Sequence, residues 1–542
     1  MQPVSDRASH PIPRSLADKM HADSWIPVIA YSAAVLAFLK NRFAVFGFPL
    51  DDAWIHRVYS RSLAFWQGFA YNTGQQEAGS TSPLWAIVTA PAHWCEGLGT
   101  DAVVLAVKAV GFVLGLVCVL VLKRIASHLT GSRLAACIAA SLFAVNPRLV
   151  FSVLSGMETT LLVAVLLGAC LALVEKRILL FLVLMGLAPI TRPEAIVLLP
   201  CSLMGIKSIW QSKRRVWTDA AASLIPLFPM AIWIAFCLRT TGHVFPNTFY
   251  LKAQSFSLSY PKPEIGLQAV TQHGLVLPWI LAAGVCAFCL FCLTGRVAYA
   301  APPFVFLVAV PLVYLFAVLG TREVFLGGYY WTRWVDPASI LITAAFCIGC
   351  GVVLTLALRD ANGPKGRFKS GRRSAARILA SFIALTFLLV SVPNFVASFK
   401  DRRNHLASDS RAIDIINVQM GKWIEQNTPN GAIVAVNDAG AIRYIGRRHT
   451  IDLLGLNNAD IAFGRVTLQE AIGMADWLAI FPMWFAQRGV LDRILNEYEP
   501  RFATTIPLEE YTICYAPSQT QKVAFQRKAP TTHPNERGKP RP

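Results

Sequence analysis

The chain has 542 residues, of which 55% are hydrophobic and only 15% are charged, and its mean hydropathy is +0.48. Soluble domains carry about 25% charged residues, so this composition excludes an ordinary soluble protein and indicates a polytopic membrane protein. The net charge of +19 would suggest a nucleic-acid partner in a soluble chain. Here Lys and Arg gather in short segments between apolar runs, where they set membrane orientation, so nucleic acid is excluded as a partner.

Several apolar segments are long enough to cross a bilayer, which takes about 20 residues. The clear candidates are 102–122, 217–238, 274–293, 299–319, 337–358 and 378–395. Shorter candidates are 25–46, 134–145 and 159–174. The apolar stretch 178–206 is interrupted at Thr191-Arg192-Pro193-Glu194. Because proline breaks a helix, this stretch is either a hairpin of two tilted helices or one interrupted span.

The basic segments predict how the chain is oriented, because cytoplasmic loops are enriched in Lys and Arg. Basic residues before position 24 place the N-terminus in the cytoplasm, and the next basic cluster, 123–133, must also lie inside. The apolar segment 83–94 then cannot span, and we expect it to lie along the outer interface. The prediction is about eleven crossings of a bacterial cytoplasmic (inner) membrane, with the C-terminal region outside.

Composition and periodicity divide the chain into regions and predict a mainly α polytopic membrane protein with an external C-terminal α/β domain. The regions are a cytoplasmic tail (1–23), a transmembrane domain (24–396) with a first external loop (47–101), the α/β domain (397–516) and a disordered basic tail (517–542). Within the α/β domain, helical periodicity precedes a series of strand-like runs. The helix is expected at 412–424, and the strands at 432–436, 450–454, 477–481, 501–506 and 511–515.

Two adjacent carboxylates, Asp51 and Asp52, stand where the first apolar stretch ends. Ionisable residues at a membrane edge are costly unless they are solvated or paired, so this acidic pair indicates a functional site. The structural alternative is that Asp51 caps a helix beginning near Ala53, while the helix dipole favours Asp52. If the segment is helical, Asp52 and His56 are four residues apart and share a face.

The predicted topology places further polar residues on the external side with this acidic pair. They are His56, Glu77, Glu158, Arg192, Glu194, Asn247, Lys252, Arg322, Arg333 and Asp438. Carboxylates can deprotonate a hydroxyl group, and Arg and Lys can hold a phosphate and stabilise its charge as it leaves. The alternative for the Arg residues is a snorkelling anchor, which is less favoured for Arg192 because it interrupts an apolar hairpin.

Two other external features have more than one interpretation. The aromatic loop 329–334 could stack on a sugar ring, or its rings could form an interfacial belt. Asp438 could reach the membrane cavity, or it could form a turn with Asn437.

A series of short motifs follows the acidic pair along the chain. They are Asp51–Ile55, Gly68–Asn72, Ala78–Trp85, Ser155–Thr159, Thr191–Glu194, Pro246–Tyr250, Asp438–Ile442 and Ile451–Leu456. The ordered set resembles the GT-C superfamily of membrane glycosyltransferases, and more narrowly the terminal arabinofuranosyltransferase group of mycobacterial cell-envelope assembly. The set is far more specific than any one motif, and the resemblance runs from about Asp51 to about Asn457.

The resemblance implies an enzyme that moves a sugar, with arabinofuranose as one candidate, from a polyprenyl-phosphate donor to an envelope glycan, lipid or protein acceptor outside the cytoplasm. Membrane lipids are further partners. It also implies Asp51 as the general base, with Asp52 as its partner or substitute, and the remaining external polar residues as substrate-binding groups. Metal dependence is left open, because Trp54 and His56 stand near the acids where wider GT-C enzymes carry further acids. A divalent metal ion is therefore the one cofactor to test.

Two other classes of function compete with the enzyme. A transporter or lipid flippase with an external sensor domain would place ionisable residues near the bilayer midplane and repeat its halves, unlike this one-sided pattern. A non-enzymatic envelope assembly factor would not need the acids. The sequence contains no Walker loop, zinc motif or dinucleotide fingerprint, so soluble nucleotide sugars are not indicated as donors.

Overall fold

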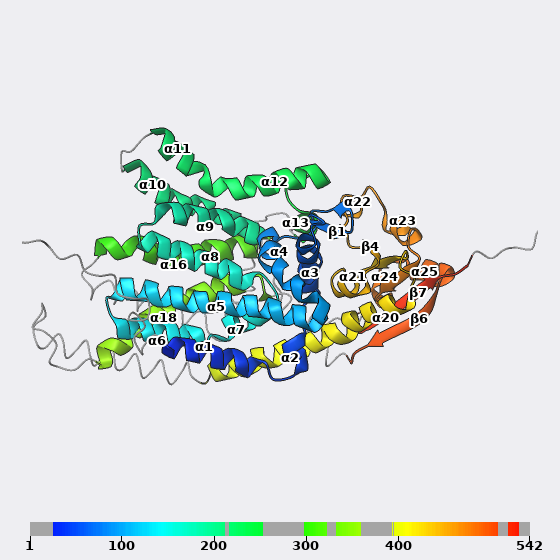
Figure 1. The fold of residues 1–542 in the computed structure, drawn as a ribbon, viewed down its shortest axis with the longest axis horizontal. Coiled ribbons are helices and arrows are strands. Elements are labelled where there is room, and N and C mark those ends of the chain that lie inside the picture. The colour runs from blue at the N-terminus through cyan, green and yellow to red at the C-terminus, as the bar shows by residue number, and fades with distance from the viewer. Residues whose placement is uncertain are drawn as a thin grey trace, which may run out of the picture.

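The computed structural model describes residues 25–211, 216–252, 297–321, 332–358, 393, 395–507 and 519–529. Helices running lengthwise occupy one half of the molecule, and a smaller α/β domain occupies the other half (Figure 1). Several predicted features lie outside the described residues. They are the span 274–293, most of the span 378–395, the strand 511–515, Arg322 and the aromatic loop up to residue 331.

The lengthwise half is a bundle of apolar helices in which α5 packs against α6 and α8, and α18 packs against α6. Its helices are α1 (Trp25–Phe38), α5 (Thr100–Thr130), α6 (Arg133–Ala144), α7 (Pro147–Leu154), α8 (Thr159–Val174), α9 (Ile178–Thr191), η4 (Pro193–Ser202), α10 (Leu203–Gln211), α11 (Val216–Leu224), η5 (Ile225–Leu227), α12 (Phe228–Thr241), α13 (Asn247–Lys252), α16 (Val297–Thr321) and α18 (Asp336–Leu358). The short helix α2 (Arg42–Phe46) follows the bend after α1. A large apolar cluster fills the interior of the bundle, together with buried polar and charged side chains such as Lys108, Arg148 and Asp336.

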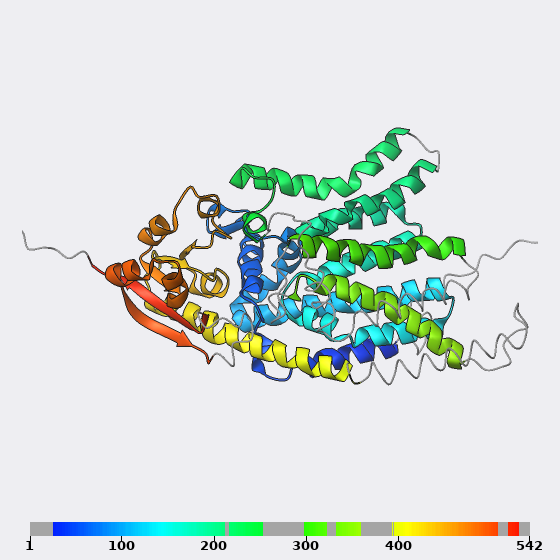
Figure 2. The ribbon, with the colours of Figure 1, turned by 180° about the vertical axis from the view of Figure 1, so that it is seen from behind.

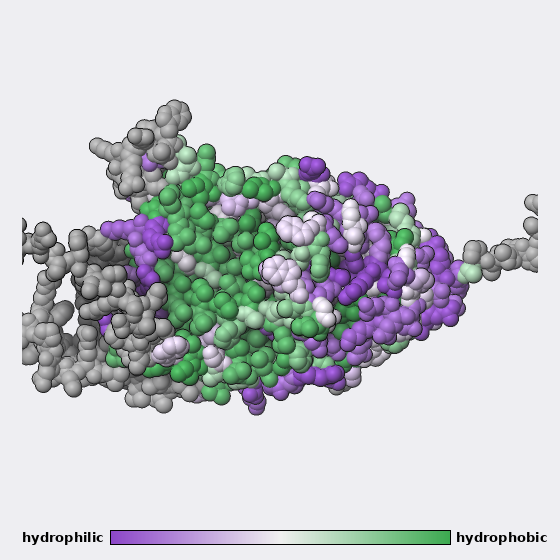
Figure 3. All heavy atoms as spheres, in the orientation of Figure 1, coloured by the Kyte–Doolittle hydropathy of each residue, from purple (hydrophilic) through white to green (hydrophobic). Residues whose placement is uncertain are grey.

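Two described helices, Thr100–Thr130 and Asp219–Thr241, are long and apolar enough to cross a membrane, and the number rises to four if each of two bent helix pairs is one span. On the face shown in Figure 3, hydrophobic residues predominate over the middle of the bundle, whereas the α/β end is largely hydrophilic. This division suits a bundle set in lipid and a domain set in water. The number of about eleven crossings stays a prediction.

A transverse layer lies between the bundle and the α/β domain (Figures 1 and 2). The chain bends by 114° between Trp25–Phe38 and Arg42–Ala64, so α3 (Asp51–Ala64) runs across the ends of the lengthwise helices. The apolar segment that was expected at the outer interface forms two short helices, α4 (Pro83–Thr89) and η3 (Ala90–Leu98), and both pack against α3.

The interrupted apolar stretch 178–206 folds back on itself. Helix α9 ends at Thr191, and Arg192 has an extended backbone before η4 begins. Gly205 in α10 lies against Phe181 of α9, so the two arms are side by side. The stretch is therefore a hairpin, and Arg192 stands at its tip.

The α/β domain begins with a long helix over 395–413, which continues through a π-helical turn (Asp414–Val418) into α20 (Gln419–Asn427). The strands are β3 (Ile433–Val436), β4 (His449–Asp452), β5 (Trp477–Ile480), β6 (Tyr498–Thr505) and β7 (Gln521–Arg527), and the short helices are α21 (Ala441–Gly446), α22 (Ala459–Ala462), α23 (Leu468–Gly473), α24 (Pro482–Gln487) and α25 (Leu491–Glu497). The sheet order is β4-β3-β5-β7-β6, parallel from β4 to β5 and antiparallel at β7 and β6.

Strand β7 corrects one prediction, because residues from 517 onward were expected to be disordered. Gln521–Arg527 instead pairs with both β5 and β6 inside the sheet. Its apolar core, Val523-Ala524-Phe525, is buried, although Lys and Arg flank it. The composition of the tail favoured disorder over a strand formed by this short apolar run.

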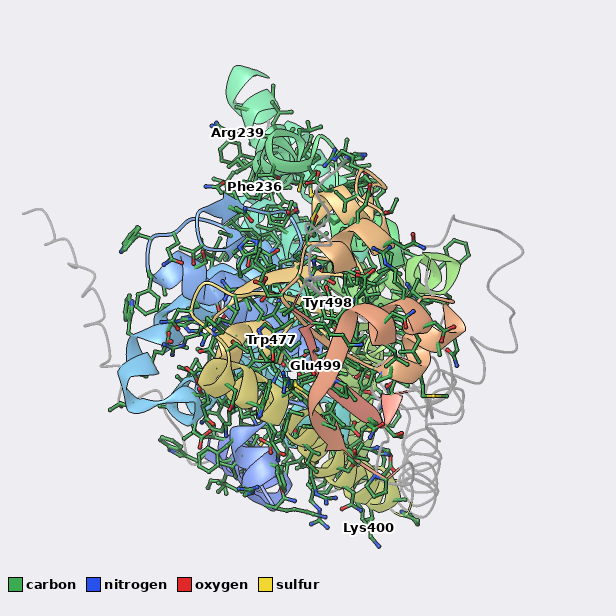
Figure 4. The ribbon with its side chains drawn as sticks, turned by 90° about the vertical axis from the view of Figure 1, so that its right-hand side faces the viewer. Phe236, Arg239, Lys400, Trp477, Tyr498 and Glu499 are labelled. Carbon is green, nitrogen blue, oxygen red and sulfur yellow. The ribbon has the colours of Figure 1, made fainter. Side chains whose placement is uncertain are left out.

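The first external loop contributes a two-stranded hairpin, β1 (Ala70–Asn72) with β2 (Gln75–Gln76), that reaches the α/β domain. The Asn72 side chain bonds to both the N–H and the C=O of Thr450 at β4. Seen from its outer end, the α/β domain covers the end of the bundle, with Trp477, Tyr498 and Glu499 near the centre and Phe236 and Arg239 of α12 toward the rim (Figure 4). The transverse layer is thus enclosed on both sides.

Candidate active site

The two acids occupy the first turn of α3, which begins at Asp51 after an extended Leu50. No side chain caps this helix, so the capping role considered for Asp51 is not found at α3. Acidic residues in a first turn are favoured by the helix dipole. Successive residues on an α-helix point about 100° apart, so the two carboxylates face different surroundings.

Asp51 faces the α/β domain. Its carboxylate accepts hydrogen bonds from Gly440 N (2.7 Å), Ala441 N (2.9 Å) and Asn417 Nδ2 (3.2 Å). The first two are N–H groups at the start of α21, so Asp51 caps a helix far along the chain. Burial and the nearby Asp438 raise the pKa of Asp51, and the N–H donors and Lys522 oppose that rise.

Asp52 faces the bundle and meets two cations. Its Oδ1 lies 2.6 Å from Lys252 Nζ, and its Oδ2 lies 2.9 Å from Arg333 Nη1. Burial would raise the pKa of Asp52, but Arg333 and Lys252 outweigh it and hold that pKa well below its ordinary value. Asp52 is therefore ionised in this arrangement.

A pocket of about 450 Å³, open mouth included, adjoins Asp52. Five of the polar residues selected from the sequence line it, and they come from α3, the α7–α8 connection, α13 and the turn before α18. The lining residues are Asp52, Ile55, His56, Gly79, Ser80, Thr81, Met157, Glu158, Thr248, Lys252, Arg333, Trp334 and Leu456. Asp52 and His56 do share a face of α3, as their spacing predicts.

His56 and Glu158 form a second polar group in the pocket. His56 Nε2 lies 3.2 Å from Glu158 Oε2, and His56 Nδ1 lies 3.3 Å from Ser80 Oγ. At the hairpin tip, Arg192 Nε lies 3.4 Å from Glu158 Oε1 and 3.7 Å from Glu194 Oε2. Arg192 and Glu194 thus stand behind Glu158 and do not line the pocket.

Trp334 connects the two charged groups. The guanidinium groups of Arg333 and Arg192 lie 4.5 Å and 5.1 Å from the centre of its ring, and Arg192 Nη1 donates to the main-chain oxygen of Arg333 (3.3 Å). The Arg333 side chain is only 2% exposed. Its position is therefore fixed before any substrate arrives.

Three of the sequence candidates lie elsewhere. Asn247 Nδ2 donates to Glu77 Oε1 (2.8 Å), and Ala459 N donates to Glu77 Oε2 (3.4 Å), so Glu77 ties the first external loop to α13 and the α/β domain. Burial raises the pKa of Glu77. Asp438 lies 2.6 Å from Lys522 Nζ of β7 and does not line the pocket.

Several pocket residues were not selected from the sequence. Ser80, Thr81 and Thr248 belong to motifs that were recognised, but their hydroxyl groups carried no separate signal. Leu456 reaches the pocket from the α/β domain, where its main-chain oxygen accepts from Thr248 Oγ1 (3.3 Å). A leucine in a loop gives no sequence signal for such a role.

The chain is similar in fold to solved membrane glycosyltransferases. ArnT from Cupriavidus metallidurans, solved bound to undecaprenyl phosphate, is 13% identical, with a TM-score of 0.55 over 94% of this chain and 99% of ArnT. The oligosaccharyltransferase AglB from Archaeoglobus fulgidus, in complex with an inhibitory peptide and a dolichol-phosphate, is 11% identical, with a TM-score of 0.51 over 92% of this chain and 74% of AglB. The fold is that of the GT-C glycosyltransferases.

A third structure shares the fold, and the match spans less than half of that structure's own length. The arabinofuranosyltransferase AftD from Mycobacteria is 14% identical, with a TM-score of 0.50 over 94% of this chain and 40% of AftD. No curated protein matches the sequence. Residues 406–532 match the family described as "Domain of unknown function (DUF8728)", a range that includes β7.

Metal ligation was left open by the motifs. Among the residues that the structure describes, no group of three or more His, Cys, Asp or Glu side chains is placed to hold a metal ion. Each pocket carboxylate lies against a cation instead, Asp52 beside Lys252 and Glu158 beside Arg192. The pocket residues that the structure describes therefore do not form a metal site.

Proposed function

We propose that this GT-C chain transfers a sugar from a polyprenyl-phosphate donor to an acceptor hydroxyl at the external face of the cytoplasmic membrane. The observation that carries the proposal is the carboxylate of Asp52, held between Lys252 and Arg333 at a pocket on the transverse layer. A base for the acceptor and cations for the leaving phosphate are the two requirements of this reaction. The lipid phosphates bound to ArnT and AglB support this donor class.

The geometry favours Asp52 over Asp51 as the general base. Asp51 receives three N–H donors from the α/β domain and does not line the pocket. Asp52 lines it, and its side chain is 21% exposed. The acceptor hydroxyl gives its proton to Asp52 as its oxygen attacks the anomeric carbon, and the sugar–phosphate bond breaks.

Lys252 and Arg333 are the proposed phosphate clamp. The donor is a phosphodiester with one negative charge, and the leaving lipid phosphate gains a second charge as the sugar departs. Two cations aimed at that charge stabilise the transition state more than the ground state, which is the requirement for catalysis. Trp334, Ser80, Thr81 and Thr248 are available to stack on and hydrogen-bond to the sugar.

The donor and the compartment can both be tested. Protein in nanodiscs is given a panel of polyprenyl-phosphate sugars, starting with arabinofuranose because of the motif resemblance, together with envelope glycan, lipid and protein acceptors. Transfer from at least one lipid donor is expected, and transfer from none would contradict the proposal.

Reporter fusions test the orientation. Fusions after Arg215 and Arg373 should report the cytoplasm, because they follow basic clusters, and fusions near Lys252, Arg333 and Glu425 should report the external side. Opposite results would show that the pocket opens to the wrong compartment for a polyprenyl-phosphate donor and an envelope acceptor.

A further inference from the structure

The carboxylate of Asp52 is fully engaged by two cations. One oxygen holds Lys252 at 2.6 Å and the other holds Arg333 at 2.9 Å, so neither cation faces the pocket without a counter-ion. Among the residues that the structure describes, these two are the Lys and Arg side chains of the pocket lining. A phosphate that enters the pocket therefore meets cations already neutralised by a carboxylate.

The three side chains differ in how easily they can rearrange. Arg333 is 2% exposed and stacked 4.5 Å above Trp334, so it is held in place. Lys252 and Asp52 are 14% and 21% exposed, and both line the pocket. An incoming phosphate can thus reach the side of the cluster at which Lys252 meets Asp52.

We infer that the donor phosphate displaces Asp52 from Lys252 and Arg333, so that the base is released only when the donor is bound. This inference rests on the proposed function and adds the order of events. A phosphate offers more acceptor oxygens than a carboxylate, and the planar guanidinium group of the buried Arg333 can donate two parallel hydrogen bonds to it. The competing anion in the empty pocket is the base itself.

Displacement has a direct chemical consequence. While both cations hold Asp52, its pKa lies below the ordinary range and the carboxylate is a weak base. Losing those neighbours removes the cause of that depression, so Asp52 becomes able to take a proton. The acceptor proton then moves to Asp52, the acceptor oxygen bonds to the anomeric carbon, and the electron pair of the broken bond stays on the phosphate oxygen facing Lys252 and Arg333.

Binding of undecaprenyl phosphate, which needs no turnover, separates displacement from simple repulsion. The full-length protein and its Asp52→Asn, Lys252→Met and doubly substituted variants are compared in nanodiscs. Asp52→Asn should bind the lipid phosphate about tenfold more tightly, because the carboxylate no longer competes. Lys252→Met should bind the lipid phosphate about tenfold more weakly. Adding Asp52→Asn to Lys252→Met should restore little of that affinity, because one of the two cations that exchange Asp52 for the phosphate is gone.

Each result decides a point. Asp492→Asn, which removes an exposed acid far from the pocket, should leave the affinity for the lipid phosphate unchanged. Thermal unfolding identifies any variant that fails to fold. If Asp52→Asn fails to fold, Asp52→Ser is used in its place. Unchanged or weaker binding by folded Asp52 variants would overturn the displacement. Equal tightening with and without Lys252 would indicate repulsion alone and would also overturn it. If the wild-type protein does not bind the lipid phosphate at all, the proposed function fails first.

Discussion

Asp51 receives N–H groups from the start of α21, whereas Asp52 receives the two cations of the pocket. The two residues have the same side chain and adjacent positions in the chain. Helix geometry turns them about 100° apart, toward the α/β domain in one case and the bundle in the other. The comparison shows that one acidic pair can have two sets of partners, with one carboxylate joining domains and its neighbour lining the pocket.

The largest expected effect is on Asp52. Asp52→Asn keeps the size of the side chain but removes the base, so transfer should fall at least about a hundredfold although lipid-phosphate binding becomes tighter. Sugar transfer and binding are measured on the same preparation. Near-normal transfer by this variant, together with loss in Asp51→Asn, would reverse the roles given to the two acids.

Arg333 tests the pocket side of the comparison. Arg333→Ala should weaken lipid-phosphate binding about tenfold to a hundredfold, because a buried charge-assisted contact is lost, and Arg333→Lys should recover only part. Arg465→Ala, which removes an exposed guanidinium of the α/β domain, is the matched control. Normal binding by both Arg333 variants would place the clamp elsewhere, with Arg192 next to be tested.

Gly440 tests the domain side. An added Cβ would collide with the main-chain oxygen and the carboxylate of Asp51, so Gly440→Ala should destabilise the fold by about 1–3 kcal/mol through overpacking. Gly431 has open space where a Cβ would be, and Gly431→Ala is the control. Thermal unfolding is the measurement. Equal stability of the two variants would show that the contact between Gly440 and Asp51 accommodates the added Cβ without strain.

Asp51→Asn should give the smallest effect. The amide keeps one oxygen acceptor, so we expect a loss of about 1–2 kcal/mol in the free energy of unfolding and a loss of transfer below about tenfold. Unfolding and sugar transfer are measured together. A hundredfold loss of transfer in a stable Asp51→Asn protein would mean that Asp51 also acts on substrate.

The sequence predicted much of this arrangement for physical reasons. Apolar run lengths indicated a polytopic membrane protein, and the resemblance of the ordered motifs implied the GT-C fold, which the solved structures confirm. One-sided placement of polar residues brought Glu158, Lys252 and Arg333 into consideration with the acids, and the structure places all three at one pocket. The fold inference depended on the motif resemblance, and the site inference depended on the predicted topology.

Other features depended on contacts that no local pattern contains. The division of roles between Asp51 and Asp52 depends on where α3 begins and on Gly440, which is distant in the chain. The partner of Asp438 is Lys522, and it belongs to a strand that the basic tail composition concealed. Leu456 reached the pocket only because its loop packs on the first external loop.

The packing around Gly79 has a consequence for building chimeras. A Cβ at this position would collide with the Tyr59 hydroxyl, the Asn457 side chain and the main-chain oxygen of Leu456. Tyr59 in turn donates to Asn457 (3.0 Å). An α/β domain grafted from a protein of the same fold must therefore supply both the Gly440 contact to Asp51 and the Asn457 contact to Tyr59. The natural unit of exchange is this domain together with α3 and the first external loop.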